Sequence, residues 1–296
     1  SLAVNGMLLG IMLYYYFEVP PYALVLNVIL IPLFPFVMLT GIGGLLFSEL
    51  SGTVGKIGFR SCDRLLSFYD KLCELTSALP GSRIVTGQPK LWWVLIYYGV
   101  LFFLCFLFYA MKNKTDNRRK QAGFSLLVCI VIAGSICGCG ILNNDSKNLQ
   151  VTVLDVGQGD SVLIQAAGKT VLIDGGERDQ GSVVLDDLKK HGVTTIDYMI
   201  ASHPHSDHIG GLVDVLEDAA VSSDLTVSMV LLPEVPDKDV PTTRVYEAFL
   251  DGIEDNHIDP TFVSEKQTLN LGGSTTLELI APPAGKTYSS LNDYSM

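Results

Sequence analysis

The chain has 296 residues, of which 48% are hydrophobic and 17% are charged, and its formal net charge is −11. The charge is unevenly divided: residues 1–142 hold 11 Lys and Arg against six Asp and Glu, whereas residues 143–296 hold nine against 25. This division excludes one uniform soluble domain. It predicts a basic, apolar first part and an acidic second part that face different solvents.

Four long apolar stretches in the first part predict transmembrane helices at about residues 1–17, 19–47, 91–111 and 123–142. Each stretch is near or above the roughly 20 apolar residues that a bilayer span requires. Buried core helices of a large soluble protein are the alternative, but such helices rarely run so long without a polar face. An amphipathic pattern further predicts an interfacial helix at about residues 56–78, or equally a loop helix packed on the bundle.

Basic side chains follow the third apolar stretch, between Lys112 and Lys120. Short basic loops remain in the cytoplasm, so the span predicted at 123–142 leads outward and everything from about Asn143 is expected to be extracytoplasmic. A solvated loop without topological meaning is the alternative. The chain begins inside an apolar stretch and without Met, so we expect it to be a fragment.

Residues 143–150 are predicted to form a polar linker, after which the pattern changes to strands and helices. The predicted strands are 149–156, 161–166, 170–173, 196–202 and 226–232, and the predicted helices are 182–191, 210–219 and 242–253. Strands that come before and between helices indicate an α/β domain.

Three histidines and an aspartate are concentrated in His203-Pro-His205-Ser-Asp207-His208, directly after a predicted strand. On an irregular loop the four side chains can point into one volume, and imidazole and carboxylate groups suit zinc, manganese or iron. His203 and His205 suit one ion, and Asp207 and His208 suit a second one about 3.5–4 Å away. The motif therefore predicts a two-metal hydrolase site, which supplies hydroxide at neutral pH.

The motif at 203–211, which continues through Ile-Gly210-Gly211, gives residues 151–296 a resemblance to the metallo-β-lactamase fold superfamily. Within that superfamily, the stretches Val153–Ser161 and Val171–Gly176 look like the hydrolase domain of ComEC-type competence proteins, which internalise DNA.

The first part is similar to the end of the membrane competence region of the same family. Asn27 with Pro32, and the stretch Ser77–Gly81, carry this similarity. The resemblance implies a multi-domain protein, an α-helical transmembrane bundle followed by a partial metallo-β-lactamase-like αββα sandwich. Residues 1–142 would be the C-terminal part of the channel region, and residues 151–296 the N-terminal part of the hydrolase domain.

By the same resemblance, two zinc or manganese ions would be held by four side chains, namely His203, His205, Asp207 and His208. Asp207 would also act in catalysis by orienting the attacking water. Asp174 would support the metal loop from beneath, and Asp155 and Asp160 would lie on the active face. A turn is the alternative for Asp174, and turn or cap positions are the alternative for the other two.

The family continues beyond an Asn-x-x-Ser strand, seen here as Asn292–Ser295, to a Gly-Asp bridging ligand and a His-His-Gly ligand, and neither motif occurs in this sequence. His191 and His257 do not stand in such motifs and are expected to be surface or core residues. We therefore expect the chain to hold half of the metal site.

The function expected from this resemblance is DNA uptake in natural transformation, with an extracytoplasmic metal-dependent domain that cleaves DNA phosphodiesters. The expected partners are DNA, in single-stranded form, the lipid bilayer and other proteins of the competence machinery. The alternatives are a non-catalytic translocation channel and a membrane-tethered hydrolase of a small ester or lactam.

Overall fold

The computed structural model describes residues 2–49, 51–112, 134, 149–222 and 224–296. The chain divides into two compact units. One consists of Ser1–Gly10 with Val19–Ile84, and the other of Ile11–Glu18 with Val85–Met296.

The N-terminal region is helical. Its helices are α1 (Leu2–Tyr16), α2 (Ala23–Ser48), α3 (Gly52–Ser77) and α4 (Leu91–Lys112), with short strands β1 (Glu18–Val19) and β2 (Ile84–Val85). Among the described residues, two helices are long and apolar enough to cross a membrane, at Val25–Ser48 and Leu91–Tyr109. Apart from residue 134, the span predicted at 123–142 lies outside the described residues, as does most of the predicted linker.

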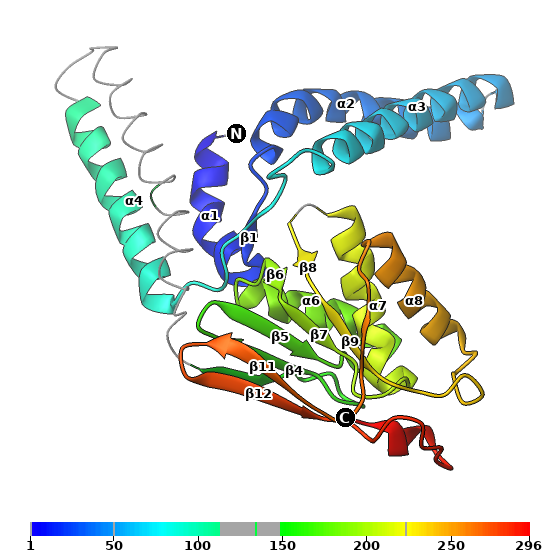
Figure 1. The fold of residues 1–296 in the computed structure, drawn as a ribbon. Coiled ribbons are helices and arrows are strands. Elements are labelled where there is room, and N and C mark those ends of the chain that lie inside the picture. Colours follow the sequence, from blue (N-terminus) through cyan, green and yellow to red (C-terminus); the bar gives the residue numbers. More distant parts are fainter. Residues whose placement is uncertain (1, 50, 113–133, 135–148, 223) are drawn as a thin grey trace. The chain divides into compact units, whose positions relative to one another are not determined.

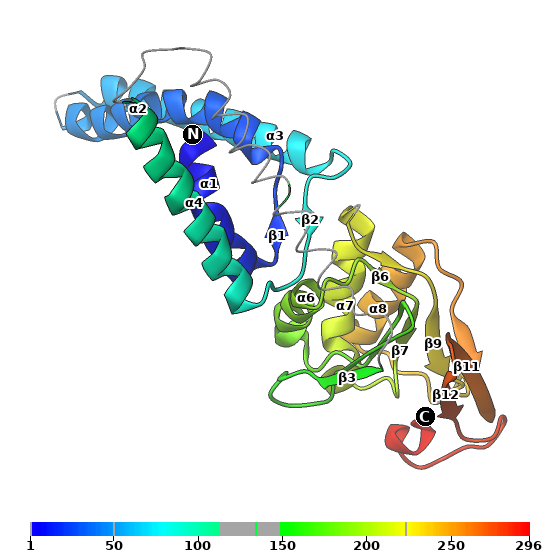
Figure 2. The same cartoon turned by 90° about the vertical axis from the view of Figure 1, so that its left-hand side faces the viewer.

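Helices α2 and α3 run side by side as an antiparallel pair (Figures 1 and 2). Glycines make this approach close: a Cβ added to Gly58 would lie 2.6 Å from the Cα atom of Gly44. Further along the pair, the Tyr69 hydroxyl donates a hydrogen bond of 2.6 Å to the Leu30 carbonyl. Small residues that bring two backbones together are the usual contact between helices in a membrane.

The second unit contains a six-stranded sheet in the order β10-β9-β7-β5-β4-β3. Its strands are β3 (Gln150–Val153), β4 (Val162–Ala166), β5 (Lys169–Ile173), β7 (Tyr198–Ile200), β9 (Val230–Pro233) and β10 (Thr261–Val263). Strands β5, β7, β9 and β10 are parallel, whereas β3 and β4 pair in antiparallel fashion at one edge. The smaller strands are β6 (Thr195–Ile196) with β8 (Thr226–Val227), and the hairpin of β11 (Lys266–Gly272) and β12 (Thr275–Ile280).

Three helices and one hairpin cover the two faces of this sheet. Helices α6 (Gly181–Lys190), α7 (Ser206–Val221) and α8 (Arg244–Asp255) lie on one face, and β11 and β12 lie on the other (Figure 1). Successive strand side chains alternate between the two cores. Leu172 and Met199 pack with the helices, whereas Val171 and Ile200 pack with the hairpin. Short 3₁₀ turns occur at Arg178–Gln180 and Leu291–Tyr294.

A helical N-terminal region followed by an α/β domain is the fold class predicted from the sequence, and the structure confirms it. The strand predicted at 196–202 is divided, because the Asp197 carboxylate accepts hydrogen bonds from the Lys169 ammonium at 2.6 Å and from the Thr170 amide at 2.9 Å. These bonds hold Asp197 between β6 and β7 rather than in either strand.

Candidate metal centre

The histidine motif begins where β7 ends, at the carboxyl edge of the parallel strands. This edge is the usual place for a site in an α/β sheet. His203 and His205 lie in the connection after β7, and helix α7 begins at Ser206 with His205 as its N-cap residue. Asp207 and His208 therefore lie on the first helical turn, and the prediction that all four side chains share an irregular loop was wrong for these two. An acidic side chain in the first turn is favourable there, because the helix dipole is positive at its start.

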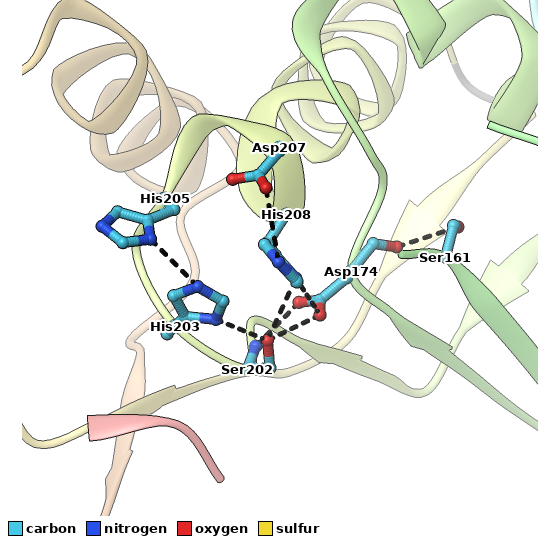
Figure 3. A network of polar contacts seen from close by, with 7 residues as sticks. All are labelled: Ser161, Asp174, Ser202, His203, His205, Asp207 and His208. Atoms are coloured by element: carbon cyan, nitrogen blue, oxygen red, sulfur yellow. Dashed lines mark hydrogen bonds and ion pairs between the residues drawn. The ribbon is translucent and has the colours of Figure 1, made fainter. Parts of the chain in front are cut away.

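The Asp174 carboxylate is the central acceptor beneath this motif (Figure 3). The side chain is buried, with 3% of the residue exposed. Its Oδ1 atom accepts the Ser202 amide at 2.7 Å. Its Oδ2 atom accepts the Ser202 hydroxyl at 2.6 Å and lies 2.9 Å from Nδ1 of His208. Both Ser202 groups donate to it, as an ionised carboxylate requires.

These contacts decide which nitrogen of His208 can bind a metal. Because an ionised Asp174 only accepts, Nδ1 of His208 carries the proton and Nε2 is left with a free lone pair. Metal-binding histidines are commonly oriented by a carboxylate in this way. The hydrogen bond to Asp174 raises the pKa of His208 above its usual value. Burial acts against this shift, and the negative charge of Asp174 adds to it.

Ser202 extends the same control to His203. Its single hydroxyl proton goes to Asp174, so its oxygen accepts from Nδ1 of His203, which lies 3.1 Å away. The Nε2 atom of His203 thereby keeps its lone pair, which faces Nδ1 of His205 at 3.1 Å. Burial, followed by the nearby charges of His208 and His205, lowers the pKa of His203 and favours the neutral imidazole that binds metals.

The spacing of the donor atoms fits a divalent metal. Nε2 of His203 lies 3.1 Å from Nδ1 of His205. Two nitrogens bound to one tetrahedral zinc ion at the usual bond length would lie about 3.3 Å apart. The second pair is looser, with 3.8 Å between Nε2 of His208 and Oδ2 of Asp207. The donor atoms therefore form two neighbouring pairs, one of two imidazole nitrogens and one of an imidazole nitrogen and a carboxylate oxygen, and both kinds of ligand suit a transition metal.

Two pairs do not make a closed shell. Among the residues that the structure describes, no group of three or more His, Cys, Asp or Glu side chains is arranged to hold one ion. The pairs are close to each other, because the rings of His203 and His208 have centroids 4.0 Å apart.

Glycines allow three loops to meet behind the motif. Gly159 has a φ of +93°, and a Cβ at this position would overlap the carbonyl oxygen of Asp207. The Gly175 amide donates to the carbonyl of His208 at 2.7 Å, and the Gly176 amide donates to the carbonyl of Asp160 at 2.9 Å. The backbone that carries Asp207 and His208 is therefore held from two sides.

The other predicted site residues are placed less centrally. Asp160 is exposed, and its charge is among those that raise the pKa of His208, so it lies on the same face as the motif. Asp155 is exposed in the turn after β3 and takes no part in the network drawn in Figure 3. His191 caps α6, and its Nδ1 atom lies 2.8 Å from the Asp187 carbonyl oxygen. His257 follows α8 and is exposed, so neither histidine belongs to the network around Asp174.

Sequence reasoning missed Ser202, which connects Asp174 to two histidines. Its one signal in the sequence was its position between a buried strand and His203. Ser161 was not singled out as a site residue either, and its buried hydroxyl donates a 3.0 Å hydrogen bond to the backbone carbonyl of Asp174.

Comparison with known proteins finds two family models that match different parts of the chain. Residues 1–111 match the family model for competence protein, and residues 154–287 match the model for the metallo-beta-lactamase superfamily. The ComE operon protein 3 of Bacillus subtilis (strain 168) is 23% identical over 221 residues, which cover 68% of this chain and 27% of that protein. The chain thus spans about a quarter of the length of this relative.

A solved structure described as a new diphosphatase from the PhnP family covers 41% of this chain and 54% of its own, with 23% sequence identity and a TM-score of 0.28. The competence match and the two long apolar helices indicate a membrane protein. The two family matches, a competence-protein region followed by a metallo-beta-lactamase domain, are consistent with a ComEC-type protein.

Proposed function

We propose that this chain is part of a multi-pass membrane protein that takes up DNA in natural transformation, and that its second part cleaves DNA phosphodiesters outside the cytoplasm. The competence match supports the uptake role. The outward orientation rests on the basic residues between Lys112 and Lys120, a stretch outside the described residues except for Lys112 itself.

The observation that carries the hydrolase proposal is the control of histidine tautomers by Asp174. One buried carboxylate, directly and through Ser202, leaves the lone pairs on the Nε2 atoms of His203 and His208 unprotonated, as metal binding requires. The two rings are thereby oriented towards neighbouring donors, and burial favours the neutral form of His203. Among known functions, metal binding accounts for it best.

The proposed metal ligands are His203, His205, Asp207 and His208, which would hold two divalent ions, zinc or manganese. When bound, such ions generate hydroxide at neutral pH and neutralise charge on a phosphodiester. Asp207 is the one carboxylate of the motif, with 37% of its side chain exposed, and it would orient the attacking water. Asp174 and Ser202 would keep the imidazoles in position while charge changes beside them. Asp155 and Asp160 would lie on the face that meets the substrate.

A matched pair of variants tests the activity. In the full-length protein supplied with manganese or zinc, we expect cleavage of single-stranded DNA, and we expect His203→Asn to reduce its rate by at least 100-fold. His257→Asn makes the same chemical change at an exposed position with a φ of +56°, which Asn tolerates, and should keep the activity. Absence of cleavage in the unaltered protein would overturn the nuclease proposal.

The acidic charge of residues 143–296 favours one alternative, a domain that keeps the fold without turnover, because phosphate recognition normally uses Lys and Arg. DNA transport by cells that carry His203→Asn, at the rate of unaltered cells, would support this translocation-only function. Hydrolysis of a small ester or lactam without DNA cleavage would instead support a membrane-tethered hydrolase of small substrates.

A further inference from the structure

The second compact unit crosses the boundary between the two family matches. It contains the segments 11–18 and 85–111 of the competence match together with the whole metallo-beta-lactamase match. Contacts that join these parts lie at the carboxyl end of α6, which is on the helix-covered face of the sheet.

An ion pair and a backbone hydrogen bond make the first two contacts. Nζ of Lys189 lies 3.4 Å from Oε2 of Glu18, and the side chains are 24% and 22% exposed. A pair so largely covered is screened less by salt than a surface pair. The amide of Gln88 donates to the carbonyl of Lys190 at 2.8 Å. The last carbonyls of a helix have no partner within the helix, so Gln88 satisfies one that α6 leaves open.

The segments that receive α6 are held to each other. The Thr86 amide donates to the Phe17 carbonyl at 2.8 Å, and the Gln88 side chain donates to the Tyr14 carbonyl at 3.2 Å. Thr86 itself is only 3% exposed. Gly192, just after α6, approaches this segment closely enough that a Cβ on it would touch Gly87 at 3.8 Å. The segments 14–18 and 85–88 are therefore bonded to each other, and together they form the surface that contacts the end of α6.

We propose that residues 189–192 form a docking surface that holds the hydrolase domain on residues 14–18 and 85–88 of the competence region. The domain is then fixed by this surface as well as by the chain connection through residues 113–148. The consequence is that the metal centre keeps a set position relative to the start of α4.

The docking agrees with the proposed topology. Helix α4 and the span predicted at 123–142 would take the chain across the membrane and back, so residues 85–88 and the hydrolase domain would lie on the same side. This agreement rests on the proposed function, whereas the contacts at α6 do not.

Hydrogen exchange in the full-length protein, without DNA or metal, tests the docking. We expect Lys189→Glu to accelerate exchange of the amides at residues 85–88 by roughly fivefold or more, because a lost pair is replaced by repulsion from Glu18. Lys190→Glu is the matched control. It also places an acid in the last turn of α6, but Lys190 is paired with Asp187 at 3.5 Å and not with Glu18.

The reversed pair Glu18→Lys with Lys189→Glu should return the exchange towards the original rate. Equal effects of Lys189→Glu and Lys190→Glu, or no protection of residues 85–88 in the unaltered protein, would overturn the docking. Exchange in β4 and β5 reports the fold of the domain itself. If Lys189→Glu disturbs these strands too, recovery in the reversed pair supports the docking and persistent damage overturns it. Nuclease activity does not enter any of these outcomes.

Discussion

Asp174 adopts a backbone conformation that most residues avoid, with a φ of +55°, and three groups surround its buried carboxylate. Asp174→Asn keeps the size of the side chain but turns an acceptor into a group that also donates. We expect metal affinity to fall about 10- to 100-fold, which is the usual effect of losing such an outer partner. Competition with a coloured chelator measures this. Asp155→Asn, at an exposed position, should leave the affinity unchanged.

The pKa of His208 predicts how stability depends on pH in the metal-free protein. The hydrogen bond to Asp174 raises this pKa in the folded state. The stabilising contribution is therefore complete below the unfolded value of about 6.5 and is lost as pH rises through the folded pKa. The stability difference between the unaltered protein and His208→Gln, measured by chemical unfolding, should shrink as pH rises across this range. A difference that grows with pH would contradict this assignment.

Gly159, in the loop before β4, packs against the backbone of Asp207 in the motif. Gly157→Ala should cost about 1–2 kcal/mol, because its φ is +70° but nothing lies within 4 Å of an added Cβ. Gly159→Ala meets the same conformational cost and also overlaps the Asp207 carbonyl. We expect a clearly larger drop in melting temperature for Gly159→Ala, together with weaker metal binding. Equal effects of the two variants would show that the junction does not support the site.

The pairing of α2 with α3 follows the same logic inside the helical region. A Cβ at Gly58 would collide with the Gly44 backbone, whereas a Cβ at Gly43 meets nothing within 4 Å. Gly58→Ala should therefore destabilise the helix pair by about 1–3 kcal/mol, while Gly43→Ala should be neutral or slightly stabilising. Thermal melting in detergent or nanodiscs compares the two. A larger loss for Gly43→Ala would contradict the helix packing described above.

The elements show where sequence patterns suffice and where they fail. Apolar length predicted the helical region, because a bilayer span requires about 20 apolar residues, and strand alternation predicted the α/β domain, because alternate strand side chains face a core. The start of α7 within the metal motif was not predicted, because Pro204 and Ser206 between the histidines indicated a loop. Ser202 was also missed, because its role depends on Asp174, which is 28 positions away in the sequence and meets it only in the folded chain.

The whole chain joins a basic, apolar part to an acidic one, and the acidic part must meet a polyanion if the proposed function holds. Residues 143–296 carry nine basic residues against 25 acidic ones. DNA approaching such a surface is repelled except where bound cations reverse the local charge. The proposed metal ions would therefore contribute to binding as well as to chemistry, and the docking at α6 would keep that one attractive place in a fixed position.

Metal content of the full-length protein is the most direct measurement of the central claim, that the motif at 203–208 binds divalent ions. The protein should be equilibrated with zinc or manganese, freed of excess ion and analysed by plasma mass spectrometry. We predict one to two ions per chain in the unaltered protein and in His257→Asn, and the loss of at least one ion in His203→Asn. No retained ion in the unaltered protein, or equal content in all three, would contradict the account.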